Sequence, residues 1–282
     1  MKYKTLNNGV KMPIIGFGVY QIWDLQLCEN SVLKALEKGY RMIDTALVYQ
    51  NEIAVGNAIK KSNIDRSEIF ITTKVWYGSD GYNLTKETIS NSLKYLQTDY
   101  IDLVLIHQPY GDYYGSWKAL EELYEKKIIR AIGVSNFSSE RLVDICLNSK
   151  IKPMVNQIEM HPFYQRDDLI EWAKKYDVAI ESWASFAECK NDIFNNPILV
   201  SIAKKYNKTP AQIILKWLIQ KDVIVIPKTV TESRMVENIS IFDFDLSDQD
   251  MKEIKKIDTN TTLFFDHTKP ESCEYIDSFR KK

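Results

Sequence analysis

Four ionisable side chains stand where short apolar runs of this sequence end. Asp44 and Tyr49 belong to the first such segment, Lys74 follows the second, and His107 follows the third. A carboxylate, a phenol, an ammonium and an imidazole together can pass a proton to a carbonyl oxygen. Lys74 can favour the phenolate and so lower the pKa of Tyr49, while Asp44 can hold Lys74 in place. His107 can donate to the same oxygen, so the set suits carbonyl reduction.

Each of these residues, taken alone, has a structural alternative. Asp44 and Lys74 would form an ordinary ion pair, Tyr49 would be a loop aromatic, and His107 would be a hydrogen-bonded histidine at a strand end. Their joint occurrence at successive strand ends favours catalysis, because the C-terminal strand ends of an α/β barrel meet at one rim.

Eight short apolar runs predict the elements that would position this set. The predicted strands span residues 14–17, 42–44, 69–73, 103–106, 131–134, 154–157, 178–182 and 223–226. Amphipathic helices are predicted between them, at residues 31–38, 85–96, 117–125 and 211–219. Alternating strands and helices imply a parallel sheet with right-handed crossovers, and eight units favour a closed (β/α)8 TIM barrel.

Two additions to the barrel are also predicted. The Asn-Gly pair within residues 6–10 is typical of a hairpin turn, so an N-terminal β-hairpin is expected. Residues 258–282 exceed the eight units and are expected to form an extra C-terminal helix or tail. Residues 186–196 are expected to be an irregular loop after the seventh strand.

Length and charge narrow the class of protein. The 282 residues include 37 basic and 38 acidic side chains, a balance that argues against nucleic-acid and membrane-surface partners. No apolar run approaches a membrane span, and the N-terminus lacks the apolar core of a signal peptide. Scattered cysteines and histidines predict free thiols and no metal site. We therefore expect a single cytoplasmic domain over residues 1–282, acting as a monomer.

Further motifs complete a pattern that resembles the aldo-keto reductase superfamily. They are Ile43-Asp-Thr-Ala, Thr73-Lys-Val-Trp76, Ile132-Gly-Val-Ser-Asn-Phe137, Asn156-Gln-Ile-Glu159 and Ile226-Pro-Lys-Thr229. The chain is similar above all to bacterial members described as 2,5-diketo-gluconate reductases or prostaglandin-F-synthase-like enzymes. The resemblance implies that Asp44, Tyr49, Lys74 and His107 are the catalytic tetrad. It also implies NADPH-dependent reduction of aldehydes, ketones and dicarbonyls to alcohols.

A hydride donor is required, yet the chain has neither a complete G-x-G-x-x-G nor a P-loop. Barrels instead bind phosphate near their last strands, at a helix N-terminus. Lys228 and Arg234 place two cations there, although an ordinary solvated helix start is the alternative. By resemblance, Lys228, Thr229 and Arg234 hold the 2′-phosphate of NADPH in preference to NADH, and Glu237 and Asn238 contact the adenine.

The remaining site residues are assigned by the same resemblance. Ser135, Asn136 and Gln157 would bond the nicotinamide carboxamide and Trp183 would stack on its ring, although Asn136 could instead cap a helix and Trp183 could be core. The residues expected to line the same cleft are Gly18, Val19 and Tyr20. The residues expected to contact an apolar carbonyl substrate are Tyr20, Trp76, His107 and Tyr110.

Departures from the family pattern concern the rim. Gln108 stands where many relatives carry Trp, Ala184-Ser185 where Ser-Pro or Ala-Pro is frequent, and Cys189 where Gly is common. They leave the tetrad intact.

Two alternatives to a reductase remain, a catalytically weak NADPH-binding barrel with a regulatory or binding role, and a barrel isomerase or racemase.

Overall fold

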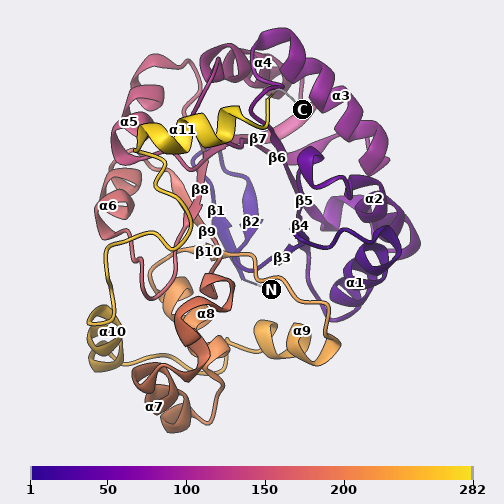
Figure 1. Ribbon diagram of the computed structural model, residues 1–282. Coiled ribbons are helices and arrows are strands. Elements are labelled where there is room, and N and C mark those ends of the chain that lie inside the picture. The colour runs from indigo at the N-terminus through magenta and orange to yellow at the C-terminus, as the bar shows by residue number, and fades with distance from the viewer. Residues whose placement is uncertain (1, 281–282) are drawn as a thin grey trace.

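The computed structural model describes residues 2–280, and its centre is a parallel sheet of eight strands (Figure 1). The strands, in spatial and chain order, are β3 (Phe17–Gly18), β4 (Met42–Asp44), β5 (Phe70–Val75), β6 (Ile101–Ile106), β7 (Ile129–Ser135), β8 (Val155–Glu159), β9 (Ala179–Trp183) and β10 (Ile224–Val225). A parallel bridge between Ile15 and Val225 joins the first strand region to the last. The sheet therefore closes, and the predicted (β/α)8 barrel is confirmed.

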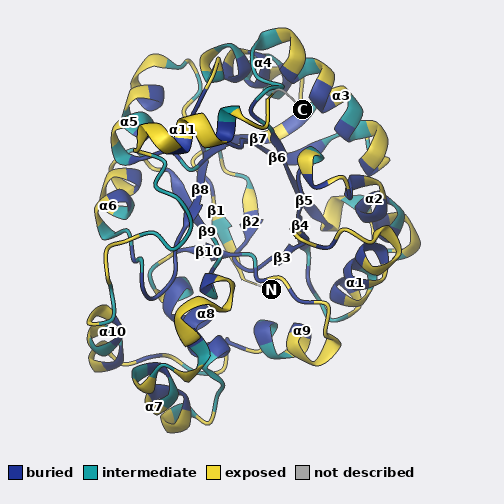
Figure 2. Cartoon of the chain, in the orientation of Figure 1, coloured by how far each residue is buried: buried dark blue, intermediate teal, exposed yellow. Residues whose placement is uncertain are grey.

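Helices form a layer around this barrel and turn their buried faces toward it (Figure 2). They are α1 (Leu25–Glu37), α2 (Glu52–Lys61), α3 (Tyr82–Leu96), α4 (Tyr113–Glu125), α5 (Ser139–Asn148), α6 (Asp167–Lys175), α7 (Pro197–Tyr206), α8 (Pro210–Gln220), α9 (Glu232–Ile239), α10 (Asp248–Lys255) and α11 (Pro270–Asp277). Three short 3₁₀ segments are η1 (Leu47–Tyr49), η2 (Arg66–Glu68) and η3 (Ala187–Asn195).

Several predicted boundaries shift for local reasons. The helix predicted at 31–38 begins at Leu25, because the Asp24 carboxylate accepts the Leu27 N–H at 2.6 Å and caps an earlier turn. The strand predicted at 14–17 is reduced to Phe17–Gly18. The loop predicted at 186–196 is largely η3, yet several of its residues have left-handed backbone angles, so its irregular course is confirmed.

The predicted N-terminal hairpin is confirmed as β1 (Tyr3–Thr5) paired antiparallel with β2 (Lys11–Pro13). Its turn is closed by the Gly9 N–H donating to Leu6 O at 2.8 Å, with Gly9 at a φ of 86°. Figure 1 shows the hairpin behind the barrel opening and α11 in front of it. The hairpin therefore covers the N-terminal end of the barrel, and the C-terminal segment crosses the other end.

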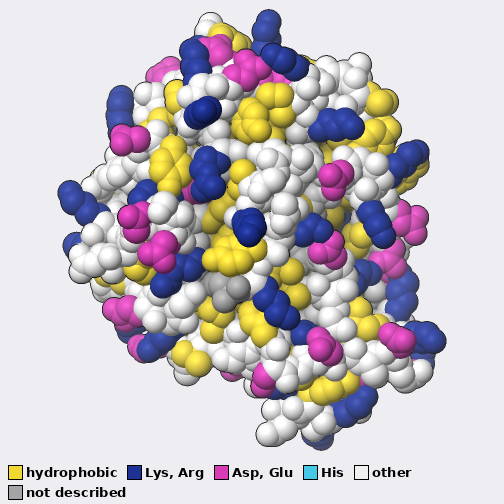
Figure 3. All heavy atoms as spheres, turned by 180° about the vertical axis from the view of Figure 1, so that it is seen from behind, with side chains coloured by type: hydrophobic (Ala, Val, Ile, Leu, Met, Phe, Trp, Pro, Cys, Tyr) yellow, Lys and Arg dark blue, Asp and Glu magenta, His cyan; other side chains and the backbone are white. Residues whose placement is uncertain are grey.

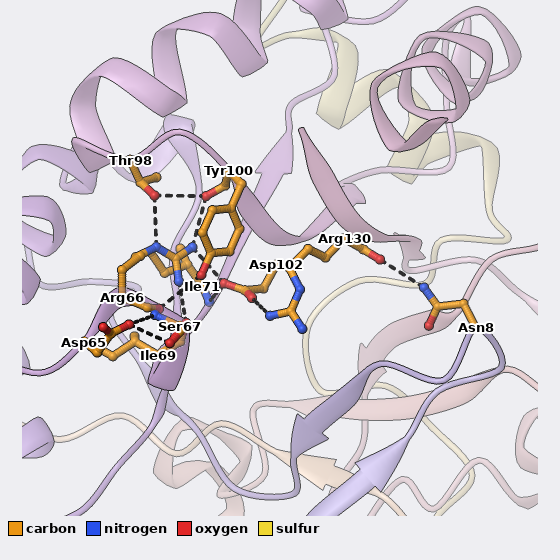
Figure 4. Close-up of polar contacts among 10 residues, drawn as sticks. All are labelled: Asn8, Asp65, Arg66, Ser67, Ile69, Ile71, Thr98, Tyr100, Asp102 and Arg130. Carbon is orange, nitrogen blue, oxygen red and sulfur yellow. Dashed lines mark hydrogen bonds and ion pairs between the residues drawn. The ribbon is translucent and has the colours of Figure 1, made fainter. Parts of the chain in front are cut away.

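An ion network centred on a buried carboxylate lies at the hairpin end of the barrel (Figure 4). Asp102 on β6 is fully buried and accepts hydrogen bonds from Arg66 Nη2 at 2.7 Å and Arg130 Nη1 at 2.6 Å. The Ile71 N–H donates to the same carboxylate at 3.0 Å, and Asn8 of the hairpin donates to Arg130 O at 2.9 Å. The carboxylate thus connects β5, β6, β7 and η2, and Arg130 extends the network to the hairpin.

The surface at this end has no single sign of charge. Figure 3 shows Lys and Arg side chains interspersed with Asp and Glu on the face opposite that of Figure 1. A cavity of about 550 Å³ opens here, and the charged residues of its lining are Lys11, Arg41, Arg130, Glu68 and Asp102.

The C-terminal segment is bonded to the rim of the barrel. The His267 Nε2 lies 3.0 Å from Gln108 Oε1, and the Tyr110 hydroxyl donates to His267 O at 2.9 Å. The Tyr77 hydroxyl donates to Asp277 Oδ1 at 2.6 Å. The helix of this segment is α11, which confirms the predicted C-terminal addition. Over residues 2–280, no helix is long and apolar enough to cross a membrane, and no group of three metal-ligating side chains gathers.

We predict that Asp102→Ala lowers the free energy of unfolding by about 3 kcal/mol, because it leaves two guanidinium groups without their buried counter-charge. Urea denaturation followed by circular dichroism measures this loss. The control is Glu125→Ala, which breaks the exposed pair with Lys150 and should cost less than about 1 kcal/mol. Equal losses in the two variants would contradict a structural role for the buried network.

Candidate active site

The structure brings the four residues of the proposed tetrad together at the C-terminal rim of the barrel. Lys74 Nζ donates to Asp44 Oδ1 at 2.6 Å and to Thr45 O at 2.9 Å. The same nitrogen lies 5.1 Å from the centre of the Tyr49 ring, and the rings of Tyr49 and His107 are 5.8 Å apart. Strands β4 and β5, the η1 turn and the residue after β6 therefore supply one cluster.

Lys74 keeps its charge although its side chain is fully buried. Burial disfavours the ammonium, but the neighbouring Asp44 and Tyr49 favour it, and together they raise the pKa of Lys74 above its ordinary value. The cluster thus contains a permanent cation in a dry environment.

The pKa of the Tyr49 phenol differs from the expectation based on the sequence. We expected the neighbouring cation to lower the pKa of Tyr49, but burial outweighs it and raises that pKa to about 12. Lys74 lowers the value in part, while Asp44 opposes it. Tyr49 is therefore held as a protonated phenol, which can give its proton only to an oxygen that is gaining negative charge.

The imidazole of His107 is neutral at physiological pH. Burial, followed by the charge of Lys74 and the proximity of His267, holds the pKa of His107 well below its ordinary range. Its Nδ1 is buried with no hydrogen-bond partner among residues 2–280. A neutral imidazole has one N–H to donate, so His107 can bond a carbonyl oxygen without carrying a charge.

A second group of polar side chains adjoins the tetrad. The Trp183 indole N–H donates to Asn136 Oδ1 at 2.9 Å, and Asn136 Nδ2 donates to His107 O at 3.0 Å. The Ser135 hydroxyl donates to Gln157 O at 2.9 Å. The structure therefore places the four residues predicted for the carboxamide and its ring side by side, at the ends of β7 and β9 and within β8.

Glu181 on β9 is a residue that the sequence reasoning missed. Gln157 Nε2 donates both to Asp44 Oδ2 at 2.9 Å and to Glu181 Oε2 at 2.8 Å. Burial, aided by the charge of Asp44, raises the pKa of Glu181 to about 8. The available signal was a carboxylate within the otherwise uncharged strand 178–182.

Of the residues predicted for a phosphate, Lys228 lies at the junction of β3 and β10, and Arg234 is in the first turn of α9. A Cβ on Gly18 would lie 2.8 Å from Ile226 O, so only glycine allows this close approach to the chain that leads to Lys228. Lys228 and Arg234 are exposed, and neither has a carboxylate within ion-pair distance among residues 2–280. Two free cations beside the start of α9 fit an anion.

The other residues predicted to bind the cofactor in this region, Thr229, Glu237 and Asn238, are bonded within the protein or buried. The Thr229 hydroxyl accepts the Thr231 N–H at 3.1 Å, which shapes the start of α9. Glu237 accepts a hydrogen bond from the Thr209 hydroxyl at 2.6 Å, and Asn238 is buried. The adenine contacts of Glu237 and Asn238 remain predictions.

Of the residues predicted to contact substrate, His107 belongs to the tetrad, and Tyr20 and Trp76 lie beside it. The Tyr20 ring lies 4.9 Å from the Tyr49 ring, and the Trp76 ring lies 4.8 Å from His107. Val19, which precedes Tyr20 in the chain, is buried, and its N–H donates to Asp44 O at 3.1 Å. Tyr110 differs, because its ring packs with Tyr77 under the C-terminal segment. No contact supports the substrate role predicted for it.

Comparison with known proteins agrees with this geometry. Residues 15–259 match the model of the aldo/keto reductase family. The chain is 45% identical to the glyoxal reductase of Bacillus subtilis, over 88% of this chain and 90% of that protein. It is 43% identical to the 9,11-endoperoxide prostaglandin H2 reductase of Trypanosoma cruzi, over 92% of each chain.

A solved structure shows the same likeness. The aldo-keto reductase AKR2E4 of Bombyx mori, determined in complex with NADP, superimposes with a TM-score of 0.89 at 31% identity. The superposition covers 93% of this chain and 94% of that one. The common fold therefore extends over nearly the whole of both molecules.

We predict that the His107 ring does not titrate between pH 8 and about pH 6, because its folded pKa lies well below 6.5. The unfolded chain does bind this proton near its ordinary pKa, so the free energy of unfolding falls as the pH drops below about 6.5. NMR of the imidazole carbons, assigned with His107→Gln, measures the titration. A His107 midpoint at or above 6.5 would contradict the neutral ring.

Proposed function

The chain belongs to the aldo/keto reductase family, and on that basis we propose that it reduces aldehydes, ketones and dicarbonyls to alcohols with NADPH. The observation that carries the proposal is the buried Lys74–Asp44 ion pair beside the protonated phenol of Tyr49. A phenol that resists ionisation, next to a fixed cation, suits protonation of a carbonyl oxygen as negative charge develops on it.

Each side chain of the tetrad has a distinct part in this reaction. NADPH, when bound, supplies the hydride that reduces the carbonyl carbon. The Tyr49 O–H bond breaks as its proton moves to the carbonyl oxygen, and the resulting phenolate is stabilised by Lys74. Asp44 keeps the ammonium in place, and His107 donates a hydrogen bond that orients the oxygen. The phenolate is then reprotonated from solvent.

The proposed cofactor contacts follow from the donors that the structure gathers. Lys228 and Arg234 supply charge for the 2′-phosphate, with Thr229 as a hydroxyl donor. Ser135, Asn136 and Gln157 offer hydroxyl and amide groups to the carboxamide. Trp183 supplies a flat apolar face for the ring.

The rim suggests which carbonyl compounds to test first. Tyr20 and Trp76 place aromatic surface on either side of the Tyr49 and His107 pair. Aromatic walls favour an apolar portion next to the reacting carbonyl, and the relatives named for glyoxal and for a prostaglandin endoperoxide span small and large substrates. We propose small α-dicarbonyls as the first class.

The alternative is a barrel that binds NADPH but turns it over weakly. The intact ion pair beside Tyr49 favours a working enzyme, because burying a lysine and an aspartate is costly and a binding role does not need them. Turnover assays beside direct binding measurements distinguish the two.

We predict that Tyr49→Phe reduces the rate of carbonyl-dependent NADPH consumption by about 100-fold or more, because the only group removed is the hydroxyl that donates the proton. NADPH affinity, measured by quenching of tryptophan fluorescence, should change little. The matched control is Tyr114→Phe, whose hydroxyl bonds Asp144 on the surface and whose rate should equal that of the unmodified protein. Loss of affinity together with rate would make Tyr49 structural.

We predict that Arg234→Ala weakens NADPH binding by about 10- to 100-fold, the value of one or two bonds to a charged group. NADH binding should be nearly unchanged, since NADH lacks the 2′-phosphate. Isothermal titration with both dinucleotides measures the ratio. Lys252→Ala, an exposed cation on α10, is the control, and an equal effect of Arg234→Ala on both dinucleotides would remove the phosphate assignment.

A further inference from the structure

Glu181 is a buried carboxyl inside the barrel that the proposed proton transfer does not use. It is fully buried on β9, where its neighbours in the sheet are Gln157 on β8 and Ile224 on β10. Its Oε2 accepts a hydrogen bond from Gln157 Nε2, and its Oε1 is buried with no partner among residues 2–280. Burying a carboxyl group that has only one hydrogen-bond donor is costly, so a function for Glu181 is worth seeking.

The amide nitrogen of Gln157 is held from two sides. Its donors point to Asp44 Oδ2 at 2.9 Å and to Glu181 Oε2 at 2.8 Å. A primary amide has two N–H donors, so both are committed. Turning the amide over would place its carbonyl oxygen against the Asp44 carboxylate, where two acceptors repel. The remaining polar atom, Oε1, is therefore available only as an acceptor.

We infer that Glu181 is a positioning residue, which fixes the Gln157 amide so that it presents its carbonyl oxygen to the amino group of the nicotinamide carboxamide. The inference rests on the proposed function, because it needs a nicotinamide cofactor at this end of the site. A carboxamide carries one acceptor and one amino group. The Gln157 carbonyl oxygen, fixed as an acceptor by Glu181 and Asp44, can bond only the amino group of that carboxamide.

The protonation of Glu181 is compatible with this role. Burial first, and then the charge of Asp44, raise its pKa, so near neutral pH the carboxyl is uncharged. The charged groups that act on it are Asp44 from β4 and Lys74 from β5, while Gln157 and Ile224 on the flanking strands carry no charge. A neutral acceptor at position 181 therefore orients Gln157 without adding a second negative charge beside Lys74.

The test compares the binding of NADPH with that of its reduced 3-acetylpyridine analogue, in which a methyl group replaces the amino group of the carboxamide. The unmodified protein should prefer NADPH by about 2- to 10-fold, the value of one hydrogen bond. Glu181→Gln keeps an acceptor of the same length and should retain this preference. Glu181→Met leaves one Gln157 N–H without a partner, so Asp44 alone holds the amide, its carbonyl oxygen can swing out of position, and the ratio should fall toward 1.

Glu52→Met is the matched control. Glu52 on α2 is also buried and also has one oxygen without a partner among the described residues, but its bonded oxygen accepts from Thr73 and not from Gln157. Its ratio should equal that of the unmodified protein. Thermal melting identifies any variant that fails to fold. If Glu181→Met fails, the preference ratio of Glu181→Gln is compared with that of the unmodified protein.

The outcomes separate the inference from the function on which it rests. An unchanged ratio in folded Glu181→Met, or a lost ratio in Glu181→Gln, overturns the inference while carbonyl turnover by the unmodified protein still supports the reductase. Failure of the unmodified protein to bind either dinucleotide overturns the proposed function and the inference with it. The expected ratios without carbonyl turnover support the positioning role and count against the reductase.

Discussion

The Lys74 ammonium sits where water does not reach it, with Asp44 bonded to it at 2.6 Å. Moving either ion out of water costs several kcal/mol, so the pair persists only because the surrounding barrel holds both groups at bonding distance. The neighbours adjust to this fixed charge. His107 stays neutral beside it, and the phenol of Tyr49 has a cation ready for the moment when it loses its proton.

The closed sheet is what makes such a cluster possible. Parallel strands end at a common rim, so residues far apart in sequence, from Asp44 to Trp183, meet there. Gln157 on β8 extends the arrangement across the barrel interior, since it bonds Glu181 on the neighbouring strand β9 and also Asp44 on the distant strand β4. The ion pair and the adjoining polar group are thus parts of one connected network.

Much of this organisation could be predicted from local sequence signals. The strand predicted at 42–44 coincides with β4, and the helix predicted at 211–219 is α8, which Thr209 and Gln212 begin with a capping box. Contacts that depend on distant segments could not be predicted. The hydrogen bond that the Tyr110 hydroxyl donates to His267 O is such a contact, because the C-terminal segment folds back onto the rim; the substrate role expected for Tyr110 stays a prediction. The pKa of Tyr49 depends on burial, which neither residue type nor spacing reports.

The junction between β3 and β10 has one more implication. Both strands are two residues long, and their edges meet through the Gly16 N–H donating to Val225 O and the Val225 N–H donating to Ile14 O. The Gly18 N–H also donates to Pro227 O across this short junction, and Gly18 and Lys228 lie on its two sides. A ligand that contacts both residues would link the two edges of the sheet. Its binding would therefore stabilise the closed barrel and make local opening at this junction rarer.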